Sequence, residues 1–277
     1  MIFPSDKTII IGHRGCRGLI PENTIEGFLK AVDVGVDALE LDVVITGDQK
    51  VLISHEPWLN NEICLDANGN EMSTAQATGI NLFQLSYEQI KKFDCGLRVN
   101  PEFPEQKKMK ATKPLLEDML IQLKEYCRQK NIPLPVICIE IKSDEKLYGK
   151  FQPQPDKFVS LVMETVSKQL TSSQYLIQSF DLNILKILHE KYPEAKLSAL
   201  NETVENTEMF FDKLGFITLY YSPYYIFIDE SAIEFCSRHG IKILAWTVNN
   251  ETDAALLKSK GVRGIITDYP DRIKSLF

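Results

Sequence analysis

Short apolar runs alternate with amphipathic helical stretches along most of the chain. The apolar runs have the length and composition of strands, and they cover residues 8–12, 38–45, 135–142, 175–178, 196–200, 216–221, 242–248 and 264–267. The stretches with apolar positions at helical spacing cover residues 24–34, 115–130, 156–170, 182–191, 208–214, 231–238 and 252–260. Strands that alternate with helices are typical of a parallel sheet. Eight such units predict an α/β fold, a closed (β/α)₈ TIM barrel, with a doubly wound open sheet as the alternative.

One segment interrupts this alternation. A turn at residues 46–48 leads into a short apolar run at 50–54. The alternation of strand and helix patterns then stops over residues 56–113. That segment holds a polar cluster at 66–70, several prolines and a single helical piece near 86–93. Fifty or more irregular residues are unusual inside a compact domain. We therefore expect one domain over residues 1–277, with 56–113 as a small insertion or lid after the second strand.

The acidic balance of the chain narrows its possible partners. The 277 residues include 38 acidic and 31 basic side chains, for a formal net charge of −7. Proteins that bind nucleic acid or anionic membranes need basic surfaces, so we expect neither to be a partner of this chain. The N-terminus shows no signal-peptide pattern and no apolar run reaches the length of a membrane span. This predicts a cytoplasmic protein without stable membrane insertion, with a secreted protein whose signal peptide has been removed as the alternative. The pattern leaves the oligomeric state open.

The six cysteines show no metal-binding or disulfide pattern. They stand at Cys16, Cys64, Cys95, Cys127, Cys138 and Cys236, and none belongs to a Cys-x-x-Cys pair. Scattered cysteines in a chain of this length are typical of small buried residues in a reducing compartment. The even number permits disulfides, but the spacing gives no reason to expect one.

Three carboxylates interrupt apolar strand runs. Glu40 and Asp42 are two residues apart in the second run, so both side chains face one side of the strand, and Glu140 lies in the next. A buried carboxylate is costly unless it is neutralised, and a structural ion pair with Arg14 or Lys142 is one solution. Three acids at the catalytic end of a barrel favour a second solution, a hard divalent cation. Oxygen ligands suit Mg²⁺, Ca²⁺ or Mn²⁺ better than Zn²⁺.

Two histidines follow apolar runs near these acids. His13 directly follows the first run, and His55 directly follows the short run at 50–54. The other two histidines, His189 and His239, lie in helical stretches and are expected at the surface. Paired imidazoles can act as general base and general acid near neutral pH. Arg14 and Lys142 are suited to bind phosphate oxygens. The combination predicts hydrolysis of a phosphate ester. Gln178, Asn249 and Asp268 are also polar residues at predicted strand ends, but the sequence suggests no function for them.

Several motifs together resemble the glycerophosphodiester phosphodiesterase family. They are His13-Arg14-Gly15, Pro21-Glu22-Asn23-Thr24, Glu40-Leu41-Asp42-Val43, His55, Pro114-Leu115-Leu116-Glu117-Asp118, Glu140-Ile141-Lys142, Trp246-Thr247-Val248-Asn249 and Gly264-Ile265-Ile266-Thr267-Asp268-Tyr269-Pro270. They occur in the family's order over nearly the whole chain. The combination is far more specific than any one of its parts.

The resemblance implies a fold, a reaction and a set of roles. It implies a TIM barrel with an insertion after the second strand, and an enzyme that hydrolyses deacylated phospholipids to an alcohol and glycerol 3-phosphate with a divalent cation, Mg²⁺ or Ca²⁺. By matching position, His13 and His55 are the acid–base pair, and Glu40, Asp42 and Glu140 are the metal ligands. Arg14 and Lys142 contact the phosphate. Trp246 lines the pocket, although an aromatic residue of the barrel core explains it equally well.

The mechanism keeps some alternatives open. We favour His13 as the base and His55 as the acid, and the attacking group is either water or the glycerol 2-hydroxyl of the substrate. The rival functions are a phospholipase C- or D-like lyase barrel, a barrel isomerase with a phosphate site, and a non-catalytic barrel that binds polyol phosphates. The negative charge favours a soluble small-molecule glycerophosphodiester over an intact bilayer lipid; an apolar or basic rim would argue against this.

The sequence departs from the family after His55, where Glu56-Pro57-Trp58 replaces the common pattern that begins with Asp. This departure leaves the headgroup of the substrate open. Four aromatic residues of the insertion form either an apolar wall of the site or, as our default, a small core of the insertion itself: Trp58, Phe83, Phe93 and Phe103.

Overall fold

The computed structural model describes residues 2–3 and 7–277 of the chain. Its strands are β1 (Ile9–Gly12), β2 (Ala38–Ile45), β3 (Val51–Ile53), β4 (Val136–Ile141), β5 (Tyr175–Ser179), β6 (Leu197–Asn201), β7 (Tyr220–Pro223), β8 (Lys242–Ala245) and β9 (Gly264–Thr267). In this part of the chain, the eight strands other than β3 run parallel in the order β1-β9-β8-β7-β6-β5-β4-β2, and β1 also pairs with β2. The sheet is therefore closed, which confirms the predicted (β/α)₈ barrel and excludes the open sheet.

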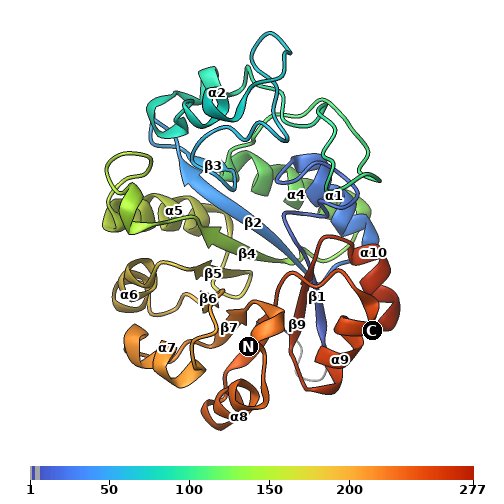
Figure 1. Cartoon of the computed structure of the whole chain (residues 1–277), viewed down its shortest axis with the longest axis vertical. Helices are drawn as coiled ribbons and strands as arrows, with labels where there is room; N and C mark the ends of the chain where they lie inside the picture. The colour runs from blue at the N-terminus through green and yellow to red at the C-terminus, as the bar shows by residue number, and fades with distance from the viewer. Residues whose placement is uncertain (1, 4–6) are drawn as a thin grey trace.

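Helices connect the barrel strands on the outside (Figure 1). The α-helices are α1 (Ile25–Val34), α2 (Thr74–Thr78), α3 (Tyr87–Ile90), α4 (Leu116–Lys130), α5 (Pro155–Gln169), α6 (Leu182–Lys191), α7 (Thr207–Leu214), α8 (Glu230–His239), α9 (Glu251–Ser259) and α10 (Pro270–Ile273). The short 3₁₀ helices are η1 (Leu82–Gln84), η2 (Glu145–Leu147), η3 (Tyr225–Phe227) and η4 (Lys274–Leu276). Each long helix lies within one or two residues of its predicted range, because an apolar stripe and a capping residue define it locally.

Alternate residues of each strand face opposite sides of the barrel wall. In β2, Leu39 and Leu41 pack outward against the helices, whereas Glu40 and Asp42 face inward. A separate inner cluster, which includes residues of β1, β4, β5, β7, β8 and β9, fills the barrel below them. Every second residue of a strand faces the barrel interior. Along this inner face the apolar residues fill the part nearer the N-terminal ends of the strands, and the carboxylates follow them at the C-terminal ends.

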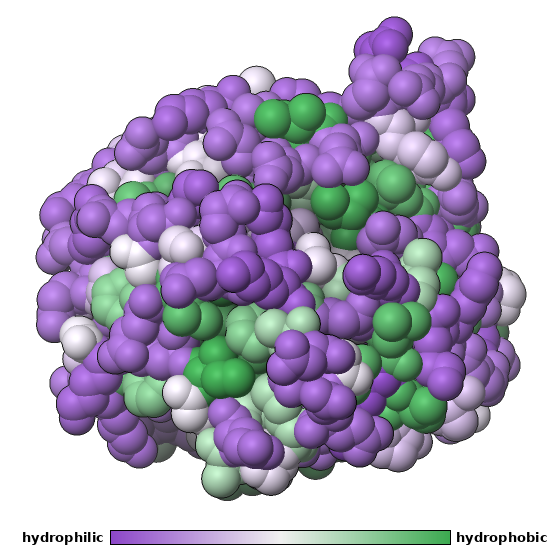
Figure 2. Space-filling model, turned by 90° about the horizontal axis from the view of Figure 1, so that it is seen from above, coloured by the Kyte–Doolittle hydropathy of each residue, from purple (hydrophilic) through white to green (hydrophobic). Residues whose placement is uncertain are grey.

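The segment between β3 and α4 lies to one side of the barrel mouth. It carries α2, η1 and α3, and it appears at the top of the view, beyond the end of β2 (Figure 1). Its buried residues form a cluster of their own with Val44 and Leu52 of the β2–β3 hairpin. The surface seen from this side is mostly hydrophilic, with small separate apolar groups (Figure 2).

The four aromatic residues of this segment have different surroundings, so our default is confirmed for Phe93 and wrong for the other three. Phe93 packs on the cluster of the segment, as expected. Phe83 instead packs on the main core, and Phe103 lies under the Arg17 guanidinium, 4.7 Å from the ring centroid. Trp58 lines the central cavity and packs edge-on against Phe151.

The expectation of free cysteines is wrong for one pair. Cys64 and Cys95 form a disulfide within this segment, whereas Cys16, Cys127, Cys138 and Cys236 are free and buried. The spacing of 31 residues could not indicate the pair, because the two cysteines meet only after the segment has folded back on its own core. Among the described residues, no helix is both long and apolar enough to cross a membrane.

The disulfide gives a first testable prediction. We expect four titratable thiols in the denatured, unreduced protein and six after reduction. Closing a loop of this length stabilises a fold by about 3–4 kcal/mol in the chain-entropy model, so the double variant Cys64→Ser/Cys95→Ser should lose stability of that order. Reducing agent should lower the Tm of the wild-type protein and leave that of the variant unchanged. Six thiols before reduction would contradict the pairing.

Candidate active site

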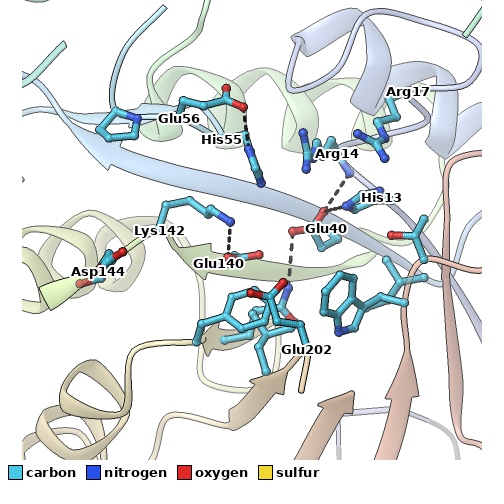
Figure 3. Close-up of a pocket in the computed structure, with 18 of the residues that line it drawn as sticks. His13, Arg14, Arg17, Glu40, His55, Glu56, Glu140, Lys142, Asp144 and Glu202 are labelled. Atoms are coloured by element: carbon cyan, nitrogen blue, oxygen red, sulfur yellow. Dashed lines mark hydrogen bonds and ion pairs between the residues drawn. The ribbon is translucent and has the colours of Figure 1, made fainter. Parts of the chain in front are cut away.

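A cavity of about 490 Å³ opens at the C-terminal ends of the barrel strands. It is lined by all eight residues that the sequence singled out except Asp42, which lies directly beneath it next to Glu40 and Glu140. Figure 3 shows His13, Arg14, His55 and the two glutamates projecting from different strands towards one central space. The closure of the barrel brings these residues together, because their strands β1, β2, β3 and β4 are neighbours in the sheet.

A tight turn after β1 places His13 and Arg14. Gly15 in this turn has φ of 89°, and a Cβ atom on it would lie 2.9 Å from the backbone of Gly27 in α1. Only glycine tolerates both the left-handed conformation and the close approach. The turn directs the backbone N–H of Arg14 onto Glu40 Oε2, at 2.8 Å.

His13 is oriented by a buried carboxylate. Its Nδ1 lies 2.6 Å from Asp268 Oδ1, and the His13 side chain is 11% exposed. Burial would raise the pKa of Asp268, but the hydrogen bonds from His13 and Arg17 and the charge of Arg17 hold it well below its usual range. Because ionised Asp268 can only accept hydrogen bonds, Nδ1 carries the proton and Nε2 faces the cavity. Burial lowers the pKa of His13 to about 4, against the opposing effect of Asp268, so the ring is neutral at pH 7.

His55 has a carboxylate partner of its own. Its Nδ1 lies 2.9 Å from Glu56 Oε1, and its side chain is 29% exposed. Burial would raise the pKa of Glu56, but the hydrogen bond from His55 and the charges of His55, Lys113 and Arg14 lower it to about 2. An ionised Glu56 again accepts a hydrogen bond from Nδ1–H and directs Nε2 towards the cavity. Both rings are thus held in the same orientation by an acid behind them.

The three acids form a compact, buried group. Glu40, Asp42 and Glu140 offer carboxylate oxygens that lie within 4.8 Å of one another, and Asp42 is the register partner of Glu140 across β2 and β4. Burial and the charges of Asp42 and Glu140 raise the pKa of Glu40 well above its usual range, and burial also raises that of Glu140. Burial works in the same direction on Asp42, but Arg14, His55 and Lys142 outweigh it and lower the pKa of that residue.

Two basic side chains flank the acids. Arg14 donates from a terminal guanidinium nitrogen to Glu22 Oε1 at 2.9 Å, and its Nε lies 3.3 Å from Asp42 Oδ2. Lys142 Nζ lies 2.7 Å from Glu140 Oε1. The structural ion pairs considered from the sequence are therefore present. They do not match all three acids. Among the residues that the structure describes, the Glu40 carboxylate interacts only with the backbone N–H of Arg14, the amide of Gln178 and the neutral ring of His13.

The donor set fits a divalent cation. All three carboxylates are at most 7% exposed, they repel one another, and they supply only oxygen ligands. Mg²⁺ and Ca²⁺ prefer such ligands, and a bound cation would offset the charge that raises the pKa of Glu40 and Glu140.

Trp246 is both a pocket-lining residue and an aromatic residue of the barrel core, the two interpretations that the sequence left open. It packs on the inner apolar cluster, and it also lines the cavity. Its indole N–H donates to the carbonyl oxygen of Ser222 at 2.7 Å, which fixes the plane of the ring.

Comparison with known proteins identifies the family. Residues 13–272 match the model of the glycerophosphoryl diester phosphodiesterase family, which is nearly the whole chain. The chain belongs to this family. The assignment confirms the resemblance found in the sequence and makes the chain an enzyme of the phosphodiesterase class.

Relatives of this phosphodiesterase agree with the assignment. A glycerophosphodiester phosphodiesterase of Caldanaerobacter subterraneus is 27% identical over 98% of both chains. A lysophospholipase D of Rattus norvegicus is 26% identical over 95% of this chain and 84% of its own. A Silicibacter pomeroyi structure with the same family description has a TM-score of 0.86 at 26% identity, covering 99% of this chain and 95% of its own. A phosphodiesterase of Oleispira antarctica, solved with sn-glycerol 3-phosphate, has a TM-score of 0.76 at 21% identity over 97% and 96% of the two chains.

Sequence reasoning missed the acids behind the histidines of this phosphodiesterase. Asp268 and Asn249 were noted as strand-end polar residues without a role, yet Asp268 accepts hydrogen bonds from both His13 and Asn249. Glu56 was noted only as a departure from the family. Arg17, which lies 2.6 Å from Asp268 Oδ1 through its Nε, was not considered. The available signal for Asp268 was its place after β9, the strand that neighbours β1 in the closed barrel.

Proposed function

We propose that this phosphodiesterase hydrolyses glycerophosphodiesters to an alcohol and sn-glycerol 3-phosphate by metal-dependent, two-histidine acid–base catalysis. The observation that carries the proposal is the arrangement of two His–carboxylate pairs around one cavity. Each histidine has its Nδ1 bound to an ionised acid, His13 to Asp268 and His55 to Glu56. Each can therefore exchange a proton through Nε2, and each lies beside the buried acids.

The residues divide the work as follows. His13, neutral and oriented by Asp268, accepts the proton of the attacking hydroxyl at Nε2. His55 acts as the imidazolium: Glu56 holds its Nδ1 proton, and the ring donates its Nε2 proton to the departing alcohol oxygen. Arg14 and Lys142 bind non-bridging phosphate oxygens and hold the diester in line, and Trp246 forms a wall against the substrate. Fixed donors of this kind stabilise the charge that develops on the phosphate in the transition state.

Glu40, Asp42 and Glu140 would hold the divalent cation. When bound, Mg²⁺ or Ca²⁺ would supply positive charge to the phosphate oxygens and so lower the barrier to displacement. The role of residues 56–113 as a lid is a further part of the proposal. Glu56, Pro57 and Trp58 at its beginning line the cavity, which supports that role.

The direct test is product analysis with glycerophosphocholine. Purified enzyme should release glycerol 3-phosphate and choline in equal amounts, lose this activity in EDTA, and regain it with Mg²⁺ or Ca²⁺. Release of phosphocholine instead would identify a phospholipase C-like cut. Activity that persists after exhaustive chelation would refute the metal-dependent mechanism.

The His55–Glu56 pair gives a second prediction. Glu56→Gln removes the charge that holds the imidazole of His55, and we expect kcat to fall by about 10- to 100-fold, a part of what a general acid contributes. Glu56→Asp keeps a carboxylate and should recover most of kcat. If kcat for Glu56→Gln equalled that of Glu56→Asp, the negative charge of Glu56 would not contribute to catalysis.

A further inference from the structure

The mouth of the cavity has two sides of different chemistry. One side, formed after β1 and β3, carries His13, Arg14, Arg17 and His55, together with Glu56, whose carboxylate is paired with His55. The other side, formed after β4, β5, β6 and β8, carries Asp144, Phe180, Glu202 and Trp246, so that acids and aromatic rings alternate around it. In Figure 3, Asp144 and Glu202 lie on the side of the cavity away from Arg14 and Arg17. We call the second set of four residues the acid–aromatic arc.

The two acids of the arc are available to a ligand. Asp144 and Glu202 are exposed, and neither forms an ion pair with any residue that the structure describes. Lys142 lies nearby, 5.6 Å from the ring centroid of Phe180, but it is already matched by Glu140 at 2.7 Å. The arc therefore presents uncompensated negative charge.

The rings of the arc are fixed in place. Phe180 packs edge-on against Trp246 with a centroid distance of 5.5 Å, and Tyr224 also packs against Trp246, with a centroid distance of 5.3 Å. Buried at the base of the arc, Gln178 is 1% exposed, and its Oε1 has no hydrogen-bond partner among the described residues. A buried acceptor without a partner is costly, and a primary ammonium could donate an N–H to it, whereas a quaternary ammonium has no N–H and would contact the rings and the acids alone.

We propose that the acid–aromatic arc is the subsite for the departing headgroup and that it selects a cationic alcohol, a quaternary or primary ammonium, over a neutral polyol. The inference rests on the proposed phosphodiesterase function. Aromatic rings attract a cation through their faces, and flanking carboxylates add an ionic component. A polyol would instead require several hydrogen-bonding side chains, and an anionic headgroup would be repelled by both acids.

The experiment compares matched substrates that differ in headgroup charge. Glycerophosphocholine and glycerophosphoglycerol form the soluble pair; lysophosphatidylcholine and lysophosphatidylglycerol form a pair that brings the same headgroups from a lipid source. We expect kcat/KM to favour the choline member of each cleaved pair by about tenfold. Asp144→Asn and Glu202→Gln should each reduce this ratio about twofold and the double variant about fourfold, because the rings keep their share of the preference. Asparagine keeps the side-chain oxygen that accepts the backbone N–H of Lys146, so the local turn is retained.

Glu145→Gln is the matched control. Glu145 is exposed, follows Asp144 directly and does not line the cavity, so its neutralisation should leave the ratio unchanged. A wild-type ratio of one or less, or a ratio that the double variant does not change, would overturn the subsite while leaving phosphodiester hydrolysis intact.

A binding measurement separates the subsite from catalysis. Choline and its neutral isostere 3,3-dimethyl-1-butanol are titrated into metal-free enzyme and followed by tryptophan fluorescence. Choline should bind more tightly, and its preference over the neutral alcohol should be several-fold smaller in the Asp144→Asn/Glu202→Gln variant. Equal binding of the two alcohols by the wild-type enzyme would reject the proposal even if no diester were turned over.

Discussion

Replacing His13 with alanine is expected to lower kcat for glycerophosphodiesters by about 10³-fold, within the range that general acid–base groups contribute. The ring faces the cavity through Nε2, and its pKa of about 4 leaves it neutral and able to accept a proton at pH 7. Alanine removes the proton acceptor and keeps the binding groups Arg14 and Lys142. We therefore expect KM to change far less than kcat, which steady-state kinetics with glycerophosphocholine would measure.

The control for this prediction is another histidine of the chain. His189 is exposed on α6 and stacks on Phe216, remote from the cavity, so His189→Ala should leave kcat unchanged. Asp268→Asn tests the orientation of the ring, because the amide can present its N–H to Nδ1 and so reverse the tautomer. A kcat within tenfold of wild type for His13→Ala would show that another group removes the proton.

The barrel and its acids could be predicted because their signals are local. The run at 38–45 is apolar except for Glu40 and Asp42, and a period of two places both on one face whatever the rest of the chain does. The same holds for the helices, since Thr24 caps α1 through its side chain and Gly35 ends it with φ of 84°. In a closed barrel, strand order alone then brings β2 beside β4 and Asp42 opposite Glu140.

The partners of the histidines could not be predicted in the same way. His13 and Asp268 are 255 positions apart, and only the pairing of β1 with β9 brings them together. Within residues 56–113 no period exists to follow, so the disulfide of Cys64 and the place of Trp58 in the cavity wall both depend on how that segment packs. Long-range closure and irregular packing leave little trace in neighbouring residues, and they determine the second layer of this site.

The acid group gives the last prediction, in which stability and activity change in opposite directions. Glu40→Gln should raise the Tm of the metal-free enzyme by about 2–4 °C, which corresponds to about 1 kcal/mol for a chain of this size. Burial and the neighbouring carboxylates raise the pKa of Glu40. A carboxyl whose pKa is raised by folding makes the fold less stable as the pH rises above the pKa that the group has in the unfolded chain. Glutamine does not titrate and removes this cost. The amide oxygen can still accept the backbone N–H of Arg14.

The same substitution should greatly reduce the stabilisation of the fold by Mg²⁺ or Ca²⁺. A ligand that binds only the folded state stabilises it by RT ln(1 + [L]/Kd), so Mg²⁺ or Ca²⁺ should raise the Tm of the wild-type enzyme and raise that of Glu40→Gln much less. We expect kcat to fall by at least about 10²-fold, because a correctly held cation contributes several kcal/mol to transition-state stabilisation. Glu26→Gln, a neutralisation on the exposed face of α1, should change neither property. If Glu40→Gln instead lowered the metal-free Tm and left the response to Mg²⁺ and Ca²⁺ intact, Glu40 would be a structural ion-pair residue. The opposite signs distinguish the two, since a ligand of a cation destabilises the empty site by its charge, whereas a member of an ion pair stabilises it.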